Sequence, residues 1–395
     1  MYHSIGPVNP DWVWNHLTTP AEIFEAQMNC LRMEGFNAIF LQELYDHMTY
    51  NNRLPPNPIA LTFDDGYFDN WVYAYPLMKR YGMKGTIYVN PGVVNPTEEY
   101  RPNLEDVWSG NCRKEDLNSK GFLSWAEMRR MEEDRVIDIQ SHTMTHDWYF
   151  MNDEIVDFHY PGDNYFWLAW MVHPERTYMY LEENQDELVK YGTPVYSYGR
   201  SLGIRRYFED KNLSECLVKY VRENGYKGFF NNKDWRKRLY KIAAEYKNNN
   251  KLNDRYETEE EFKKRVEYEL AGSKRIIEEK LNKRVNFLCW PGAAFSEEVV
   301  KAAKETGYLS TTLYFADKKI KNIFGENPFE INRIDCGAAV FWRNRVVSYV
   351  DIGFFMANIK HFRGSKIYFC VKRFYQIKYM LLFAVRKILK QENIQ

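Results

Sequence analysis

A buried strand that runs directly into two carboxylates is the feature that most constrains this chain. Residues 59–63 are apolar and partly β-branched, which predicts a buried strand, and Asp64, Asp65 and Gly66 follow it. Adjacent carboxylates at a strand end repel each other and lose hydration, so a fold keeps them where a cation or a catalytic proton compensates. An ordinary Asp-Gly turn is the structural alternative.

A second predicted strand ends in a pair of histidines. Residues 136–140 alternate as a strand does, and Ser141-His142-Thr143-Met144-Thr145-His146 follows. Two histidines four residues apart lie on one face of a helical turn, from which both imidazoles can reach one metal ion. Chemistry collects at the carboxyl ends of parallel strands in α/β folds. One carboxylate with two imidazoles leaves coordination positions open, which is typical of a catalytic metal site.

Strand and helix patterns alternate through most of the chain, which is typical of a parallel α/β sheet or barrel. Capping boxes predict helix starts at Thr19-Pro20-Ala21-Glu22 and Ser124-Trp125-Ala126-Glu127, and Ser296 caps a third helix. Further helices are expected at 69–81 and 259–281, the latter with a solvated, charged face. Apolar runs predict strands at 37–41, 85–90, 285–290, 309–315 and 329–336.

Residues 148 to about 258 break this alternation. They contain Trp148, Trp167, Trp170 and Trp235 with many tyrosines. We interpret the stretch as a long aromatic-rich insertion over the strand ends that forms a lid or wall for substrate. The run Tyr196-Ser197-Tyr198-Gly199-Arg200-Ser201-Leu202 is the part of greatest interest, although a packed aromatic loop explains it as well.

The two strand-end motifs together resemble a known family. Thr62-Phe63-Asp64-Asp65-Gly66 and His142-Thr143-Met144-Thr145-His146 resemble the first two motifs of the polysaccharide deacetylases, carbohydrate esterase family 4. Met1-Tyr2-His3-Ser4-Ile5 is similar to the start of a permuted branch, the poly-N-acetylglucosamine deacetylase type. The resemblance covers residues 1 to about 150 and about 275 to 340. It implies an α/β fold, a distorted, incomplete (β/α) barrel, with a catalytic domain at 1–345 and a tail at 346–395.

The resemblance also implies a reaction, the removal of an acetyl group from an N-acetylated sugar by a metal-dependent hydrolase. Asp65, His142 and His146 would hold a divalent metal, Zn²⁺ or else Co²⁺ or Ni²⁺. The metal would lower the pKa of water and polarise the amide carbonyl. Asp64 would act as the general base, and the substrate would be an N-acetylated glycan or a lipid-linked sugar.

Three further site assignments follow from the resemblance. The turn Trp290-Pro291-Gly292-Ala293 would supply the backbone N–H that binds the oxyanion. The family has an arginine shortly before this proline, where Cys289 stands here, and Arg333 is the nearest substitute for holding Asp64. The late Leu-Leu-His-Asp motif is absent, and the permuted branch points to His3 as the general acid.

The composition indicates which partners and which cellular compartment are compatible with the chain. The formal net charge is zero, which argues against non-specific electrostatic binding of nucleic acid. The six cysteines are scattered without a C-x-x-C pair, which fits a reducing compartment. We find no signal-peptide pattern and no run long enough to span a bilayer, and we expect a cytoplasmic protein, with contact at the inner face of the membrane as an option.

The C-terminal tail offers that membrane option. Residues 366–390 contain seven basic residues and no acidic one, and Lys372, Arg373, Arg386, Lys387 and Lys390 share an arc of a helical wheel. A basic, aromatic helix of this kind can lie on an anionic membrane surface. A helix docked on the barrel with its charges in water is the alternative, and both stay open.

Two other functions remain as alternatives. One is a non-catalytic carbohydrate-binding protein on a deacetylase fold, which would have no chemical need for Asp64, Asp65, His142 and His146 together. The other is a deacylase of a small, non-sugar amide. The aromatic insertion favours a bulky sugar substrate over the second.

Overall fold

A six-stranded parallel sheet forms the core of the fold. The computed structural model describes residues 1–9, 12–314, 321–335, 339–342, 345–348 and 351–392. In spatial order the strands are β14 (Glu330–Arg333), β13 (Ser310–Tyr314), β12 (Phe287–Cys289), β7 (Ile137–Ser141), β6 (Gly85–Val89) and β5 (Leu61–Phe63). All neighbouring pairs are parallel, as the alternating pattern predicts. Phe315 and Cys336, at the ends of two predicted strands, lie outside the described residues.

The first residues of the chain lie between the two edge strands. The Tyr2 N–H donates to the Thr62 carbonyl at 2.8 Å, and the Asp64 N–H donates to the Tyr2 carbonyl at 3.0 Å. On the other side, the Met1 nitrogen donates to the carbonyl of Ile334, directly after β14, at 2.9 Å. These contacts link β5 to the end of β14, so the curled sheet forms the distorted, incomplete barrel that the family resemblance implies.

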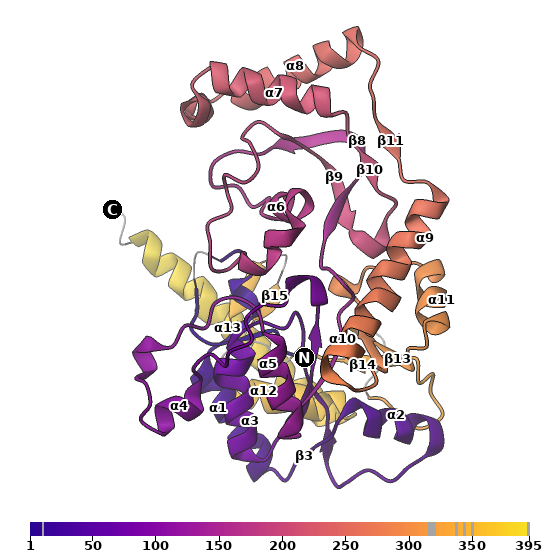
Figure 1. Ribbon diagram of the computed structural model, residues 1–395. Helices are drawn as coiled ribbons and strands as arrows, with labels where there is room; N and C mark the ends of the chain where they lie inside the picture. Colours follow the sequence, from indigo (N-terminus) through magenta and orange to yellow (C-terminus); the bar gives the residue numbers. More distant parts are fainter. Residues whose placement is uncertain (10–11, 315–320, 336–338, 343–344, 349–350, 393–395) are drawn as a thin grey trace.

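Helices cover the outer face of this barrel (Figure 1). One core cluster joins Phe24 and Met28 of α1 to Phe63, Ile87 and Leu288 on three strands. The helices are α1 (Ala21–Met33), α3 (Tyr75–Tyr81), α5 (Trp125–Glu133), α10 (Ser273–Leu281), α11 (Glu297–Glu305) and α12 (Ile352–Phe362), with the short α4 (Leu104–Trp108) between β6 and α5.

The inside of the barrel has a core of its own. Leu44 and Met48 of α2 (Leu41–Tyr50) cluster with Tyr88, Phe287 and Ile331. Successive strand residues point to opposite faces, so this cluster fills the interior on the side of the strand starts. The parallel pair β3 (Asn37–Ala38) and β4 (Pro58–Ile59) flanks α2. The carboxyl ends of the strands therefore remain as the open end of the barrel.

Two predicted helix caps are confirmed and one is wrong. The Ser124 hydroxyl accepts the Glu127 N–H and the Ser296 hydroxyl accepts the Val299 N–H, both at 3.3 Å. The expected box at Thr19 does not form, because Pro20 occupies the cap position and makes no side-chain cap. Thr19 instead belongs to β2 (Thr18–Thr19), which pairs with β1 (Ser4–Ile5).

Two other local predictions also need correction. The helical turn expected at 142–146 is a loop, because Thr143 has a φ of +66°, which no right-handed helix contains. The strand expected at 37–41 is only the two-residue β3, because α2 already begins at Leu41. The predicted helix at 259–281 is present as α9 (Glu259–Glu267), a π-helical segment (Tyr268–Gly272) and α10.

The insertion rises from the carboxyl ends of the strands and forms the upper half of Figure 1. A long antiparallel ribbon of β8 (Trp148–Phe158) and β9 (Pro194–Arg200) carries α6 (Trp167–Val172) on one side. Beyond it lie α7 (Lys211–Glu223) and α8 (Trp235–Asn249), while β10 (Tyr207–Phe208) pairs with β11 (Arg255–Tyr256). Its two apolar clusters are separate from the barrel core.

Two consecutive helices end the chain and differ in burial. Phe355, Met356 and Ile359 of α12 belong to the barrel core, although the sequence division assigns α12 to the tail. The expected boundary at 345–346 falls inside β16 (Arg345–Ser348), which pairs with β15 (Ala339–Trp342). Helix α13 (Lys366–Glu392) extends away from the barrel (Figure 1). No helix in the described part of the chain is long and apolar enough to cross a membrane.

Candidate active site

A cavity of about 320 Å³ opens at the carboxyl ends of the strands, between barrel and insertion. The barrel side contains the charged and polar residues His3, Asp64, Asp65, His142, His146 and Arg333, the turn residues Trp290, Gly292 and Ala293, and apolar residues such as Tyr67 and Phe122. The insertion side is aromatic and contains Trp148, Phe166, Trp170 and Tyr180, together with Arg200. The cavity therefore brings together the predicted site residues except Pro291, which is not part of its lining.

Each of the three barrel loops at the cavity contains a non-glycine residue with a positive φ. They are Asp65 (φ +73°), Thr143 (φ +66°) and Ala293 (φ +58°). L residues rarely adopt this left-handed conformation, which costs about 1–3 kcal/mol per residue. Such strain persists where the surrounding structure fixes the backbone, and it collects at functional sites.

Asp65, His142 and His146 converge on one point. The Asp65 Oδ1 lies 3.2 Å from the His142 Nε2 and 3.7 Å from the His146 Nε2. The His142 Nδ1 lies 2.8 Å from the Cys289 carbonyl oxygen, and an Nδ1–H donated there leaves Nε2 free to bind a metal. Burial lowers the pKa of His146 to about 4 despite the charge of Asp65, so this imidazole is neutral, as a metal ligand must be.

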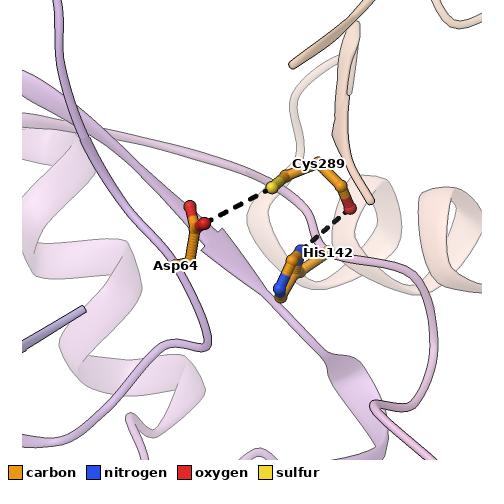
Figure 2. A group of neighbouring side chains, drawn as sticks. All are labelled: Asp64, His142 and Cys289. Carbon is orange, nitrogen blue, oxygen red and sulfur yellow. Dashed lines mark hydrogen bonds between the residues drawn. The ribbon is translucent and has the colours of Figure 1, made fainter. Parts of the chain in front are cut away.

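A second group of possible ligands shares His142 with the first (Figure 2). Asp64 Oδ2 lies 3.5 Å from the Cys289 Sγ, and one atom each of Asp64, His142 and Cys289 lie within 4.8 Å of one another. Arg333 already donates to both Asp64 oxygens and lies 2.9 Å from the Cys289 Sγ. A bound guanidinium repels a metal cation, so Asp65, His142 and His146 are the better metal site.

Asp64 is held by an arginine from the far edge strand. Arg333 of β14 donates from Nη1 to Asp64 Oδ1 at 2.6 Å and from Nη2 to Oδ2 at 2.9 Å, and Nη1 also contacts the Thr62 hydroxyl at 3.1 Å. Burial raises the pKa of Asp64, but Arg333 and then His3 outweigh it and lower the pKa to about 2. Asp64 is therefore ionised, and its carboxylate plane is fixed by two parallel hydrogen bonds.

His3 is the third histidine of the cavity. Its Nε2 lies 3.8 Å from Asp64 Oδ2, so the residues predicted as general acid and general base are neighbours in the cavity. The His3 carbonyl accepts a hydrogen bond from the Asn70 side chain at 2.9 Å, which fixes the backbone at this point. His159 is buried against Asp163, and His173 lies beside Glu175, so neither lines the cavity.

The turn at 290–293 approaches the cavity with its backbone. Pro291 has no N–H, and the Ala293 N–H donates to the Trp290 carbonyl at 3.1 Å. The remaining backbone donors of the turn belong to Trp290 and Gly292, both of which line the cavity.

The geometry agrees with what comparison with known proteins finds. Residues 51–201 match the family model described as polysaccharide deacetylase, and both strand-end motifs lie within this range. Over this range the chain is similar to the polysaccharide deacetylases. It is 38% identical over 89 residues to the putative polysaccharide deacetylase YxkH of Bacillus subtilis (strain 168). That match covers 22% of this chain and 30% of the relative, less than a third of its length.

The fold has a counterpart among solved structures. A de-N-acetylase from Aggregatibacter actinomycetemcomitans aligns with 91% of this chain and 97% of its own, with a TM-score of 0.51 and 18% identity. At this identity the likeness concerns the fold, and it confirms the barrel type. The assignment to the permuted branch of the deacetylase family stays a prediction.

Glu269 is a residue beside the site that sequence reasoning missed. It lies within the helix expected to be solvated, yet only 1% of it is exposed. Its carboxylate accepts the Thr145 N–H at 2.9 Å and the Thr145 hydroxyl at 2.6 Å, and its carbonyl accepts the Met144 N–H at 3.0 Å. These bonds hold the loop that ends in His146. The π-helical segment that carries Glu269 leaves no mark in the apolar pattern, although such segments are frequent at functional sites.

Arg200 is the second residue without a predicted role. The sequence singles out the run 196–202, and the structure shows that most of it is strand β9 rather than a loop. Arg200, at the end of β9, reaches the cavity from the insertion. The aromatic neighbours of the run were the available signal, but nothing local marks which side chain would point into the site.

Proposed function

We propose that this chain is a metal-dependent hydrolase that removes an acetyl group from an N-acetylated sugar. The observation that carries the proposal is the convergence of Asp65, His142 and His146 beside the buried Asp64–Arg333 pair. Metal-assisted amide hydrolysis requires a set of metal ligands and, next to it, an ionised carboxylate that can act as general base. The match of residues 51–201 to the polysaccharide deacetylase family model supports the same class of reaction.

Asp65, His142 and His146 would hold the metal. Two imidazoles and one carboxylate suit zinc, and the same set also accepts Co²⁺ or Ni²⁺. When bound, the ion would supply Lewis-acid chemistry, lowering the pKa of water and polarising an amide carbonyl. The Cys289 carbonyl orients His142, and Glu269 holds the loop of His146, so both imidazoles are fixed before a metal arrives.

Asp64 would be the general base that takes a proton from the attacking water. The contact with Arg333 keeps the carboxylate ionised and fixes its orientation. Arg333 thereby takes the place of the family arginine that Cys289 replaces. The two arrangements differ in chain position, since Arg333 comes from β14 rather than from the strand before the turn.

His3 would protonate the leaving nitrogen. Among the described residues, His3 is the histidine of the cavity that the metal assignment does not use, and imidazole is the side chain suited to proton transfer near neutral pH. The Gly292 or Trp290 N–H would bind the oxyanion of the tetrahedral intermediate.

The aromatic side of the cavity supports a sugar substrate. Trp148, Phe166, Trp170 and Tyr180 line the same cavity as the charged residues of the barrel. Apolar sugar faces pack on such rings, and a small acetamide would not need a wall of this size.

The test is acetate release from a panel of N-acetylated glycans by the zinc-loaded protein, with Asp64→Asn as the inactive control. Release by the parent and not by the variant supports the proposal. Glycan binding by calorimetry without any acetate release would favour the non-catalytic alternative. Release from small amides but from no glycan would favour the deacylase alternative.

We also propose that α13 lies on an anionic membrane surface. Tyr379 bonds Asp351 at 2.6 Å, so one face of α13 is docked. Another face is apolar and exposed at helical spacing, and its residues are Ile367, Phe374, Ile377, Leu381 and Val385. The charged residues of the helix at 366–390 are all basic, which complements the charge of anionic lipid. The side chains of Arg386, Lys387 and Lys390 lie outside the described part, and the cytoplasmic location stays a prediction.

A further inference from the structure

Arg200 differs from three arginines that are largely buried in the described chain. These three bond carboxylates, in the pairs Arg101–Glu127, Arg265–Glu257 and Arg333–Asp64. No carboxylate of the described residues forms an ion pair with Arg200, and no described group accepts a hydrogen bond from its side chain. Its guanidinium cannot lose its proton in a protein, so an unpaired positive charge faces the cavity.

The position of this charge is fixed by two contacts. The guanidinium lies 4.9 Å from the centre of the Trp148 ring, in a cation–π contact. It also lies against the backbone of Gly292, where a Cβ on this residue would overlap it. Gly292 has a φ of +53°, so its conformation and the approach of Arg200 both call for a residue without a side chain. Arg200 is therefore seated on the turn proposed to bind the oxyanion.

The neighbouring charges leave Arg200 without a counter-ion. Asp64 is neutralised by the two hydrogen bonds from Arg333. Asp65 attracts Arg200 at longer range, but its Oδ1 faces His142 and His146. Removing a cation from water without a bonded partner is costly, and that cost is offset when a ligand brings the anion. A guanidinium is the side chain best suited to bind a carboxylate or a phosphate through two parallel hydrogen bonds.

We infer that Arg200 is a specificity residue that binds an anionic group, a carboxylate or a phosphate, carried by the substrate close to its acetamido group. The inference rests on the proposed function and narrows it to acidic or phosphorylated glycans. Trp148 packs on the same guanidinium, so the insertion supplies both the anion contact and a ring for the sugar. The barrel supplies the groups for the reaction itself.

The test compares three N-acetylated oligosaccharides of equal length: a neutral one, one with a neighbouring uronic acid and one with a neighbouring phosphate. Arg200→Gln should lower the ratio of anionic to neutral kcat/KM about ten- to hundred-fold, mainly through KM, because a charge-assisted hydrogen-bonded contact is lost. The anionic substrate with the larger loss identifies the source of the charge. Arg200→Lys should restore only part of the ratio, because lysine lacks the planar fork.

A matched control lies in the same insertion. Arg205 is half-buried, pairs with Glu259 at 2.7 Å and does not line the cavity, so Arg205→Gln removes the same charge away from the cavity and should leave the ratio unchanged. Gly292→Ala should displace the guanidinium and lower the ratio as Arg200→Gln does. An unchanged ratio in Arg200→Gln would overturn the inference, and so would an equal loss of kcat on all three substrates, which would make Arg200 part of the reaction.

Binding separates this inference from the proposed function. Asp64→Asn is expected to bind substrate without turnover, so calorimetry can compare the three glycans in Asp64→Asn with and without Arg200→Gln. A preference for anionic glycans that disappears in the double variant supports the role of Arg200 even if the parent releases no acetate. Equal binding of all three glycans overturns that role even if the parent is an active deacetylase.

Discussion

The two sides of the cavity are built by different kinds of interaction. On the barrel side, polar groups are oriented by short hydrogen bonds, as Asp64 is by Arg333 and the loop of His146 by Glu269. On the insertion side, rings pack on rings, as Phe166 does on Tyr180 at 4.8 Å between centroids. Paired hydrogen bonds fix an atom closely, whereas ring contacts allow a range of angles and offsets.

This difference suggests a division of labour. Chemistry requires reacting groups held within fractions of an ångström, which the barrel side provides. Recognition of the proposed sugar substrate would tolerate more variation and draw on apolar area, which the insertion side offers. Substitutions on the barrel side should therefore reduce metal binding or kcat, and substitutions on the insertion side should mainly raise KM.

The largest effect should come from the metal ligands. Asp65→Asn and His146→Ala should lose most of the metal, about one ion per chain in the parent, and abolish activity, because each removes one of only three protein ligands. Elemental analysis measures the metal directly. Cys289→Ala is the matched control and should keep its metal, since we assign Cys289 to the arginine contact. Full metal retention in both ligand variants, or its loss in Cys289→Ala, would contradict the assignment.

Asp64 should separate from its neighbour Asp65. Asp64→Asn should keep the metal and lose about 10³- to 10⁴-fold in kcat, because a general base is removed and a ligand is not. Breaking a buried pair leaves Arg333 without its counter-charge and costs about 3–5 kcal/mol, so thermal unfolding should be measured beside activity. If Asp64→Asn and Asp65→Asn had the same metal content and the same residual activity, the division between base and ligand would be wrong.

The sequence predicts the barrel side better than the insertion side, for physical reasons. Asp64, Asp65 and the two histidines stand in short motifs at strand ends, where the apolar pattern locates the strand and the topology brings the ends together. Arg333 could be named only as a candidate, since its bond to Asp64 joins strands 269 residues apart.

The site residues that the sequence did not identify take their positions from local features of the backbone conformation. Thr143 adopts a positive φ that its side chain disfavours, and a π-helical segment turns Glu269 inward. Arg200 points into the cavity from a strand whose pairing with β8 includes register irregularities. None of these features follows from the apolar period.

His3 lies on the barrel side of the cavity, and its substitution tests whether it is one of the catalytic groups. His3→Ala should keep fold and metal and lose about 10²- to 10⁴-fold in turnover of an N-acetyl sugar, because the leaving amine needs a proton. The loss should shrink for an acetyl ester with a good leaving group, which needs less protonation. Parallel assays of the two substrates supply the measurement. Parent-like hydrolysis of the N-acetyl sugar by His3→Ala would remove His3 from the catalytic groups.

Phe166 tests the insertion side. Phe166→Ala should raise KM about two- to ten-fold with little change in kcat, in line with the about 0.5–1.5 kcal/mol of one aromatic contact. Steady-state kinetics on a neutral glycan measure the split. Tyr226→Ala is the control, since Tyr226 is an exposed aromatic residue of the same insertion away from the cavity. A fall in kcat with unchanged KM would show that the insertion takes part in the reaction and would break the division between the two sides.

The smallest effect on chemistry should come from α13, which lies on neither side of the cavity. Phe374 and Leu381 are 66% and 63% exposed on its apolar face. Burying each side chain in a lipid interface is worth about 1.5–3 kcal/mol at most, so Phe374→Ser and Leu381→Ser should each weaken binding to anionic vesicles about ten-fold. Both side chains are mostly exposed and lie away from the cavity, so turnover of a soluble glycan should stay at the parent level. Co-sedimentation with vesicles measures the binding, and Tyr379→Phe, which alters the docked face instead, should bind as the parent does. If the parent does not bind vesicles at all, α13 is only a docked helix with its charges in water.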